Sequence, residues 1–185
     1  MCQPSSHDTM PASLQLGRRQ FLRLAALGGG AALLGSFLPQ QALAAGGTEA
    51  LLLSCMDYRL VDDTERFMAG MGMRNKYDHI VLAGAALGAI SPKFPAWNTA
   101  FWEHLQVAID LHHIRQVVIL DHRDCGAYKV ILGEDFGKTP DAETAVHAET
   151  LMQLRQQIVG KYPQLQVYTY LMALDGSVQQ IVPRS

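Results

Sequence analysis

Residues 116–127 read QVVILDHRDCGA and combine a predicted buried strand with two candidate metal ligands. Its first part, QVVILDH (116–122), is almost continuously apolar, which is typical of a strand covered on both faces of a parallel sheet. Its second part places His122 and Cys125 three residues apart, and Gly126 allows a tight turn directly after them. The predicted strand therefore ends in two side chains that can bind a metal ion.

Apolar runs and helical patterns alternate on both sides of this stretch. The other predicted strands are EALLLSC (49–55), HIVLAGA (79–85), LQVYTYLMAL (165–174) and a short last strand, 178–182. The predicted helices span residues 61–75, 94–113 and 142–160, and Asp62 or Asp63 is placed to cap the first of them. The Asp175-Gly176 pair is a turn signal that returns the last strand beside its neighbour. The pattern predicts an α/β fold, with a mainly parallel β-sheet of four to five strands, right-handed crossovers and flanking helices.

Length and composition limit the chain to one folded domain. With 185 residues, 49% of them hydrophobic, it can bury one globular core. Its formal net charge is −2, with acidic and basic residues interspersed, so we expect no nucleic-acid partner. Three cysteines are too few for a disulfide framework.

Residues 1–44 are expected to be an export signal, and 45–185 the mature domain. Arg18 and Arg19 precede an apolar run at 24–38 and the small residues ALA at 42–44, an order that resembles a twin-arginine signal peptide. We therefore expect a periplasmic or otherwise exported protein that meets the twin-arginine machinery transiently. The alternatives are an uncleaved membrane anchor and a disordered tail.

Cys55 ends the first predicted strand in the stretch SCMDYR, residues 54–59. Ligand sites of parallel sheets lie beyond the carboxyl ends of the strands, so Cys55, His122 and Cys125 are expected at one edge. Two thiolates and one imidazole with an open fourth position are typical of a catalytic zinc site. The alternative is a disulfide between the two cysteines, which is the ordinary state of such a pair in an oxidising compartment.

Asp57 and Arg59 follow Cys55 at alternate positions. If the chain stays extended there, the three side chains share one face, and Arg59 can hold Asp57 ionised. The alternative for this pair is an ordinary surface ion pair. Asp121 and Asp124 directly precede the candidate ligands His122 and Cys125, and either is expected to accept a hydrogen bond from His122.

The two blocks together, Cys-x-Asp-x-Arg and His-x-x-Cys-Gly, resemble those of the β-class carbonic anhydrases. The resemblance implies Zn²⁺ bound by Cys55, His122 and Cys125, with Asp57 orienting a zinc-bound hydroxide and Arg59 keeping Asp57 from the metal. The implied activity is that of a zinc lyase, the reversible hydration of carbon dioxide to bicarbonate and a proton. A homodimer or higher homo-oligomer is also implied.

The segment VLAGAALG, residues 81–88, stands where this family usually carries Arg-Asn-Ala-Gly. Two alternatives therefore stay open: a zinc hydrolase of a carbon dioxide analogue such as carbonyl sulfide or carbon disulfide, and a non-catalytic zinc-binding homologue. Four aromatic residues at helical spacing are expected in the core, with a rebuilt substrate pocket as the alternative: Phe94, Trp97, Phe101 and Trp102. Five histidines are expected to be solvated or core residues rather than ligands: His79, His104, His112, His113 and His147.

Overall fold

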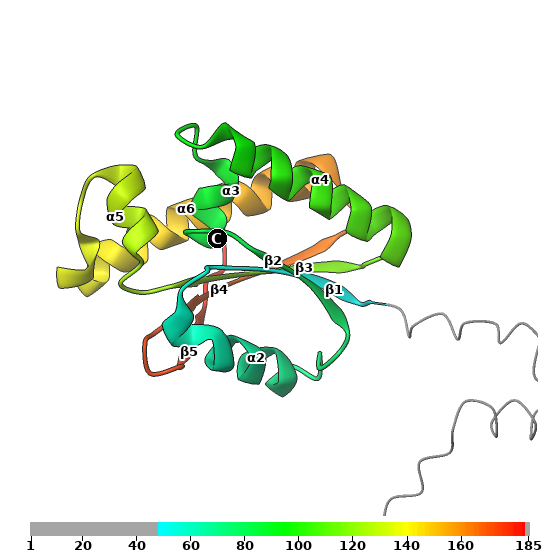
Figure 1. The fold of residues 1–185 in the computed structure, drawn as a ribbon, viewed down its shortest axis with the longest axis horizontal. Coiled ribbons are helices and arrows are strands. Elements are labelled where there is room, and N and C mark those ends of the chain that lie inside the picture. Colours follow the sequence, from blue (N-terminus) through cyan, green and yellow to red (C-terminus); the bar gives the residue numbers. More distant parts are fainter. Residues whose placement is uncertain (1–47, 184–185) are drawn as a thin grey trace, which may run out of the picture. The chain divides into compact units, whose positions relative to one another are not determined.

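The computed structural model describes residues 48–183 (Figure 1). The expected export signal, residues 1–44, lies outside the described residues. Within the described part, no helix combines the length and the apolar character needed to cross a membrane.

Five strands form one mixed sheet in the order β2-β1-β3-β4-β5. The strands are β1 Ala50–Ser54, β2 Tyr77–Val81, β3 Gln116–His122, β4 Gln166–Met172 and β5 Val178–Gln180. Neighbours are parallel except for β4 and β5, which are antiparallel around the Asp175-Gly176 turn. The predicted fold class is confirmed, as are the five strands and the returning last strand.

The strands are joined by five α-helices and two short 3₁₀ turns. The helices are α2 Val61–Gly70, α3 Ala85–Ile90, α4 Pro95–His112, α5 Gly126–Leu132 and α6 Pro140–Lys161, and the turns are η2 Tyr58–Leu60 and η3 Phe136–Lys138. Helices α4 and α6 match the predicted ones to within two residues at each end, whereas α2 ends at Gly70, five residues before its predicted end. The sequence did not predict α3 and α5, which are only one to two turns long.

Helices cover both faces of the sheet (Figure 1). On one face, α3, α4 and α6 pack over the strands, and their buried side chains include Phe101, Leu105 and Leu154. On the other face, α2 places Met68 against Leu52 of β1. This two-sided cover explains why β1 and β3 are apolar along almost their whole length.

The start of α2 differs from the prediction. Its N-cap is Leu60, which makes no side-chain cap bond, and Asp62 and Asp63 lie inside the first turn. The chain does not stay extended through Arg59, because the 3₁₀ turn η2 begins at residue 58 and leads directly into α2. The capping carboxylate is Asp57, which accepts a hydrogen bond from the backbone N–H of Arg59 at 3.0 Å.

The strand order reverses between β1 and β3, and this places the site. The chain moves from β1 to β2 on one side and then crosses to β3 on the other. The two strands pair in register, with Ser54 opposite Leu120. Ligand sites in such sheets lie beyond the carboxyl ends of the strands at this reversal. The residues that follow Ser54 and Leu120 therefore meet at one edge.

Two leucines of α4 test the packing of the helix on the sheet. Leu105 is 0% exposed and Leu111, on the same helix, is 69% exposed. Leu105→Ala is expected to lower the free energy of unfolding by about 2–5 kcal/mol, because it leaves a cavity in the core. Leu111→Ala should change it by less than about 0.5 kcal/mol. Urea denaturation of both variants measures the difference, and equal losses would contradict this placement of α4.

Candidate metal centre

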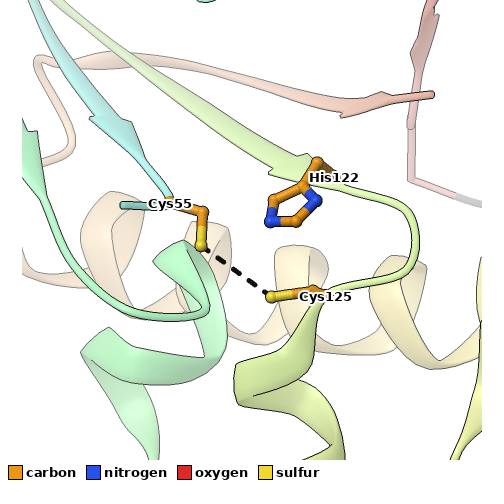
Figure 2. A group of neighbouring side chains, drawn as sticks. All are labelled: Cys55, His122 and Cys125. Atoms are coloured by element: carbon orange, nitrogen blue, oxygen red, sulfur yellow. Dashed lines mark hydrogen bonds between the residues drawn. The ribbon is translucent and has the colours of Figure 1, made fainter. Parts of the chain in front are cut away.

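Cys55, His122 and Cys125 form one compact group of side chains (Figure 2). Their donor atoms all lie within 4.8 Å of one another, and the two Sγ atoms are 3.8 Å apart. Cys55 follows β1, His122 ends β3, and Cys125 is the N-cap of α5. The sequence predicted that these three residues meet, and within residues 48–183 this group is the one cluster of its kind that could hold a metal ion.

The cysteines are not bonded to each other. Both are free, and their Sγ–Sγ distance of 3.8 Å far exceeds the length of about 2.05 Å of a disulfide bond. The Cys125 thiol donates to the Cys55 sulfur and thereby lowers the pKa of Cys55 well below that of an ordinary thiol, against the effect of burial. The same shared proton, together with burial, raises the pKa of Cys125. A cation between the two sulfurs would favour the thiolate form of both.

His122 presents one ring nitrogen to this group. Its side chain is buried, and its Nδ1–H donates to the backbone carbonyl of Arg123 at 2.8 Å. In the neutral imidazole Nε2 then carries a lone pair, and this atom is buried without a hydrogen-bond partner among the described residues. A buried nitrogen without a partner is rare in proteins, and a metal ion at the centre of the group would satisfy it.

The prediction that an aspartate accepts a hydrogen bond from His122 was wrong. Neither neighbouring aspartate accepts from it, because Arg123 supplies a backbone oxygen instead. The side chain of Asp121 bonds to Tyr128 and His147, while that of Asp124 accepts from Arg59. A backbone carbonyl orients the imidazole as well as a carboxylate would, but no sequence pattern reveals it.

Asp57 stands next to the ligand group but is held by Arg59. Arg59 donates from Nε to Oδ1 at 3.0 Å and from Nη2 to Oδ2 at 2.8 Å. These hydrogen bonds lower the pKa of Asp57 to about 2. Asp57 Oδ2 lies 3.8 Å from His122 Nε2. An ionised carboxylate thus faces the ligands with both oxygens occupied by a guanidinium.

Arg59 is shared with a second carboxylate that the sequence did not assign to it. Its Nη1 donates to Asp124 Oδ2 at 2.9 Å, and its Nη2 to the Asp124 backbone oxygen at 3.1 Å. Lys129 approaches the same carboxylate at 3.4 Å. Asp124 has a φ of 53°, an unusual value for a residue other than glycine. Arg59 is therefore fixed between the two segments that carry the cysteines.

The loop between His122 and Cys125 is held in place by Glu143 of α6. Glu143 is buried, and its Oε1 accepts from the backbone N–H of Asp124 at 2.6 Å. Its Oε2 accepts from Arg123 Nη1 at 3.2 Å. Sequence reasoning missed this residue, because a lone glutamate on a predicted helix carries no signal of burial.

A cavity of about 620 Å³ opens beside the ligand group, and both cysteines line it. Its apolar wall includes Phe94 and Trp97, whose rings stack with centroids 4.0 Å apart. The core assignment of these two residues was wrong. It is confirmed for Phe101, which is fully buried, and for Trp102, which packs against the core. Phe94 is the N-cap of α4 and Trp97 lies in its first turn, so both belong to the end of the helix that borders the cavity.

The pKa of Asp57 makes a testable contribution to stability. Because this pKa is depressed to about 2 in the folded protein, the carboxylate stabilises the fold above its unfolded pKa of about 3.9, and this contribution is lost as pH falls toward 2. Arg59→Gln should therefore lower the free energy of unfolding near neutral pH, and its difference from wild type should shrink at pH values below about 4.

Urea denaturation at a series of pH values, with a chelator present so that metal release does not contribute, measures this difference. Arg66→Gln is the control, because the Arg66 side chain is 70% exposed in its pair with Asp63. An Arg59→Gln effect that is independent of pH would contradict the assigned pairing.

Comparison with known proteins identifies the family. A model of the protein family described as "Putative carbonic anhydrase" matches residues 45–182. An uncharacterized protein of Rickettsia conorii is 44% identical over 131 residues, which are 71% of this chain and 70% of that protein. One of Rickettsia bellii is 42% identical over 134 residues, 72% of this chain and 82% of that protein.

Solved structures share the fold at low sequence identity. A β-carbonic anhydrase of Trichomonas vaginalis is 16% identical with a TM-score of 0.50, covering 90% of this chain and 98% of that one. A Coccomyxa β-carbonic anhydrase in complex with acetazolamide is 13% identical with a TM-score of 0.50, covering 92% and 88%. With the sheet, the Cys-His-Cys group and the family match in agreement, this chain belongs to the carbonic anhydrase family and has the β-carbonic anhydrase fold.

Proposed function

We propose that this protein is a zinc lyase that interconverts carbon dioxide and bicarbonate, with Cys55, His122 and Cys125 holding the metal. The observation that carries the proposal is the combination of this ligand group with a carboxylate, Asp57, that faces it and is held away by Arg59. A purely structural zinc site needs four protein ligands and neither of these two side chains.

The donor set fits zinc. Thiolate and imidazole are the ligands that zinc prefers in proteins, and a catalytic site supplies three of them. In a tetrahedral site with Zn–S bonds of about 2.3 Å, two sulfurs are about 3.8 Å apart. The Sγ atoms of Cys55 and Cys125 are 3.8 Å apart, and the unpaired Nε2 of His122 completes the set.

When bound, zinc supplies a nucleophile at neutral pH, because it lowers the pKa of a coordinated water from about 16 to about 7. Asp57 stays ionised at this pH, so its Oδ2 can accept a hydrogen bond from the attacking oxygen. This hydrogen bond would orient the attacking oxygen toward the carbon of the substrate. Arg59 occupies the remaining lone pairs of Asp57 and keeps the carboxylate from serving as a ligand.

The cavity suits an apolar substrate. Carbon dioxide carries no net charge and needs only a small apolar space beside the ligands, which Phe94 and Trp97 help to provide. The same cavity also favours a second candidate substrate class, carbonyl sulfide and carbon disulfide, because it is much larger than carbon dioxide and mostly apolar. A non-catalytic role is disfavoured by the Asp57–Arg59 pair.

Self-association is a further part of the proposal. Three apolar side chains along the cavity are strongly exposed, Met56 at 66%, Tyr58 at 86% and Val130 at 61%. Exposed apolar surface of this kind is typical of interaction sites. A second copy of the chain is the occupant we propose for it.

Removal of one thiolate tests the metal ligands. The purified wild-type protein should contain stoichiometric zinc by elemental analysis, and Cys55→Ser should lose most of it together with stability, because zinc binding and folding are coupled. Val61→Ser is the control, since Val61 is exposed at the start of α2 and does not line the cavity. A wild-type protein without zinc and without free thiols under denaturing, non-reducing conditions would instead identify a disulfide.

Stopped-flow hydration of carbon dioxide tests the reaction. Asp57→Ala should keep its zinc but lose activity by about 100-fold, the usual size of the contribution from a positioned acid or base. Asp62→Ala, on the exposed start of α2, should behave as wild type. Full zinc occupancy without hydration in the wild type would overturn the carbon dioxide assignment, and hydrolysis of carbonyl sulfide or carbon disulfide by the same protein would establish the second candidate.

A further inference from the structure

Asp121 carries a carboxyl group in the interior of the protein that neither the ligand set nor the proposed reaction uses. The residue is 1% exposed. Its Oδ1 accepts from the backbone N–H of Ala86 at 3.0 Å. Its Oδ2 accepts from the Tyr128 hydroxyl at 2.5 Å and from His147 Nδ1–H at 2.9 Å. All three partner residues are buried as well.

Asp121 lies on one segment that carries a metal ligand, and its hydrogen bonds join it to a second such segment and to a helix whose N-cap contacts the third ligand. Asp121 itself directly precedes His122 at the end of β3. Tyr128 lies in the first turn of α5, and its backbone N–H donates to the Cys125 carbonyl at 3.1 Å. Ala86 lies in the first turn of α3. Gly84, the N-cap of that helix, donates its N–H to Cys55 Sγ at 3.4 Å.

His147 connects the same carboxyl group to α6. It is 2% exposed, and its ring packs on that of Tyr128 with centroids 3.9 Å apart. It lies one helical turn after Glu143, which braces the loop between His122 and Cys125. Asp121 thus ties α3, α5 and α6 to the end of β3 at the point where the ligands converge.

A contribution to the stability of the fold does not by itself explain why the Asp121 carboxyl group is buried. Burying a carboxyl group is costly, and well-packed apolar side chains often replace such networks without loss of stability. A fully bonded buried network does, however, favour one arrangement of its elements over close alternatives. A metal site needs such an arrangement, because small displacements of a ligand segment alter the coordination geometry.

We propose that Asp121 is a positioning residue of the metal centre. Through Ala86, Tyr128 and His147 it sets the separation of Cys55, His122 and Cys125, and so the affinity and coordination geometry of the metal. The proposal rests on the metal-binding part of the proposed function and is independent of the reaction that the metal supports.

Zinc affinity and the absorption spectrum of the Co²⁺-loaded protein test this role without an activity assay. In Asp121→Asn one acceptor oxygen becomes a donor, so the side chain cannot satisfy Ala86, Tyr128 and His147 together. We expect zinc affinity, measured by competition with a chromophoric chelator, to fall by about 10- to 100-fold, as is usual for outer-shell partners. The Co²⁺ d–d bands should shift in the same variant.

A pair of variants at His147 gives a graded test away from the ligands. In His147→Asn the amide can replace the Nδ1–H donor, so zinc affinity should stay within about 3-fold of wild type, whereas His147→Leu should lose about 10-fold. If Asp121→Asn does not fold, these two His147 variants test the positioning role of Asp121 in its place.

Leu154→Ala separates positioning from general stability. Leu154 lies on α6 two turns beyond His147, is 0% exposed and packs in the core, so its loss should destabilise the fold. Its zinc affinity and Co²⁺ spectrum should match wild type. Wild-type affinity and spectrum in Asp121→Asn and His147→Leu, or an equal loss of affinity in Leu154→Ala, would overturn the role of Asp121. A wild-type protein that binds neither metal would overturn the proposed zinc site itself.

Discussion

The parallel pairing of β1 with β3 is the constraint on which the rest of the site depends. The register sets Ser54 opposite Leu120, so the next residues of both strands, Cys55 and Asp121, leave the sheet at the same level. His122 and the turn to Cys125 follow within a few residues, and the two sulfurs come to lie 3.8 Å apart. A shift of one residue in this register would turn His122 to the other face of the sheet and break up the ligand group.

Charge balance around the ligands depends on a few shared groups. Arg59 bonds to Asp57 and Asp124 together, which joins the segment after β1 to the loop after β3. Glu143 holds that loop from α6 through a backbone N–H. Each buried or half-buried carboxylate therefore has its own donors, and Asp57 alone faces the ligands. This arrangement separates structural carboxylates from the one that we propose to act on the substrate.

Much of the fold could be predicted because its signals are local. Continuous apolar runs identified the buried strands, and the spacing of Cys55, Asp57, His122 and Cys125 pointed to one sheet edge. The prediction erred where side-chain hydrogen bonds and the placement of helices on the sheet decide. The chain turns into a 3₁₀ helix at Tyr58 because Asp57 caps it, although alternation suggested an extended segment. Phe94 and Trp97 line the cavity from the start of α4, and helical spacing could not distinguish that position from the core.

Periodicity and residue type were therefore enough to predict the fold class, the mainly parallel sheet with its returning last strand, and the three donors that gather at one edge. The order of the strands and the partner of each polar group followed only from the packing of the elements in space. His122 bonds to a backbone oxygen, Asp124 to Arg59, and Asp121 to His147 some 26 residues away. The physical reason is that a hydrogen bond depends on distance and direction in space, and packing of helices on the sheet sets both.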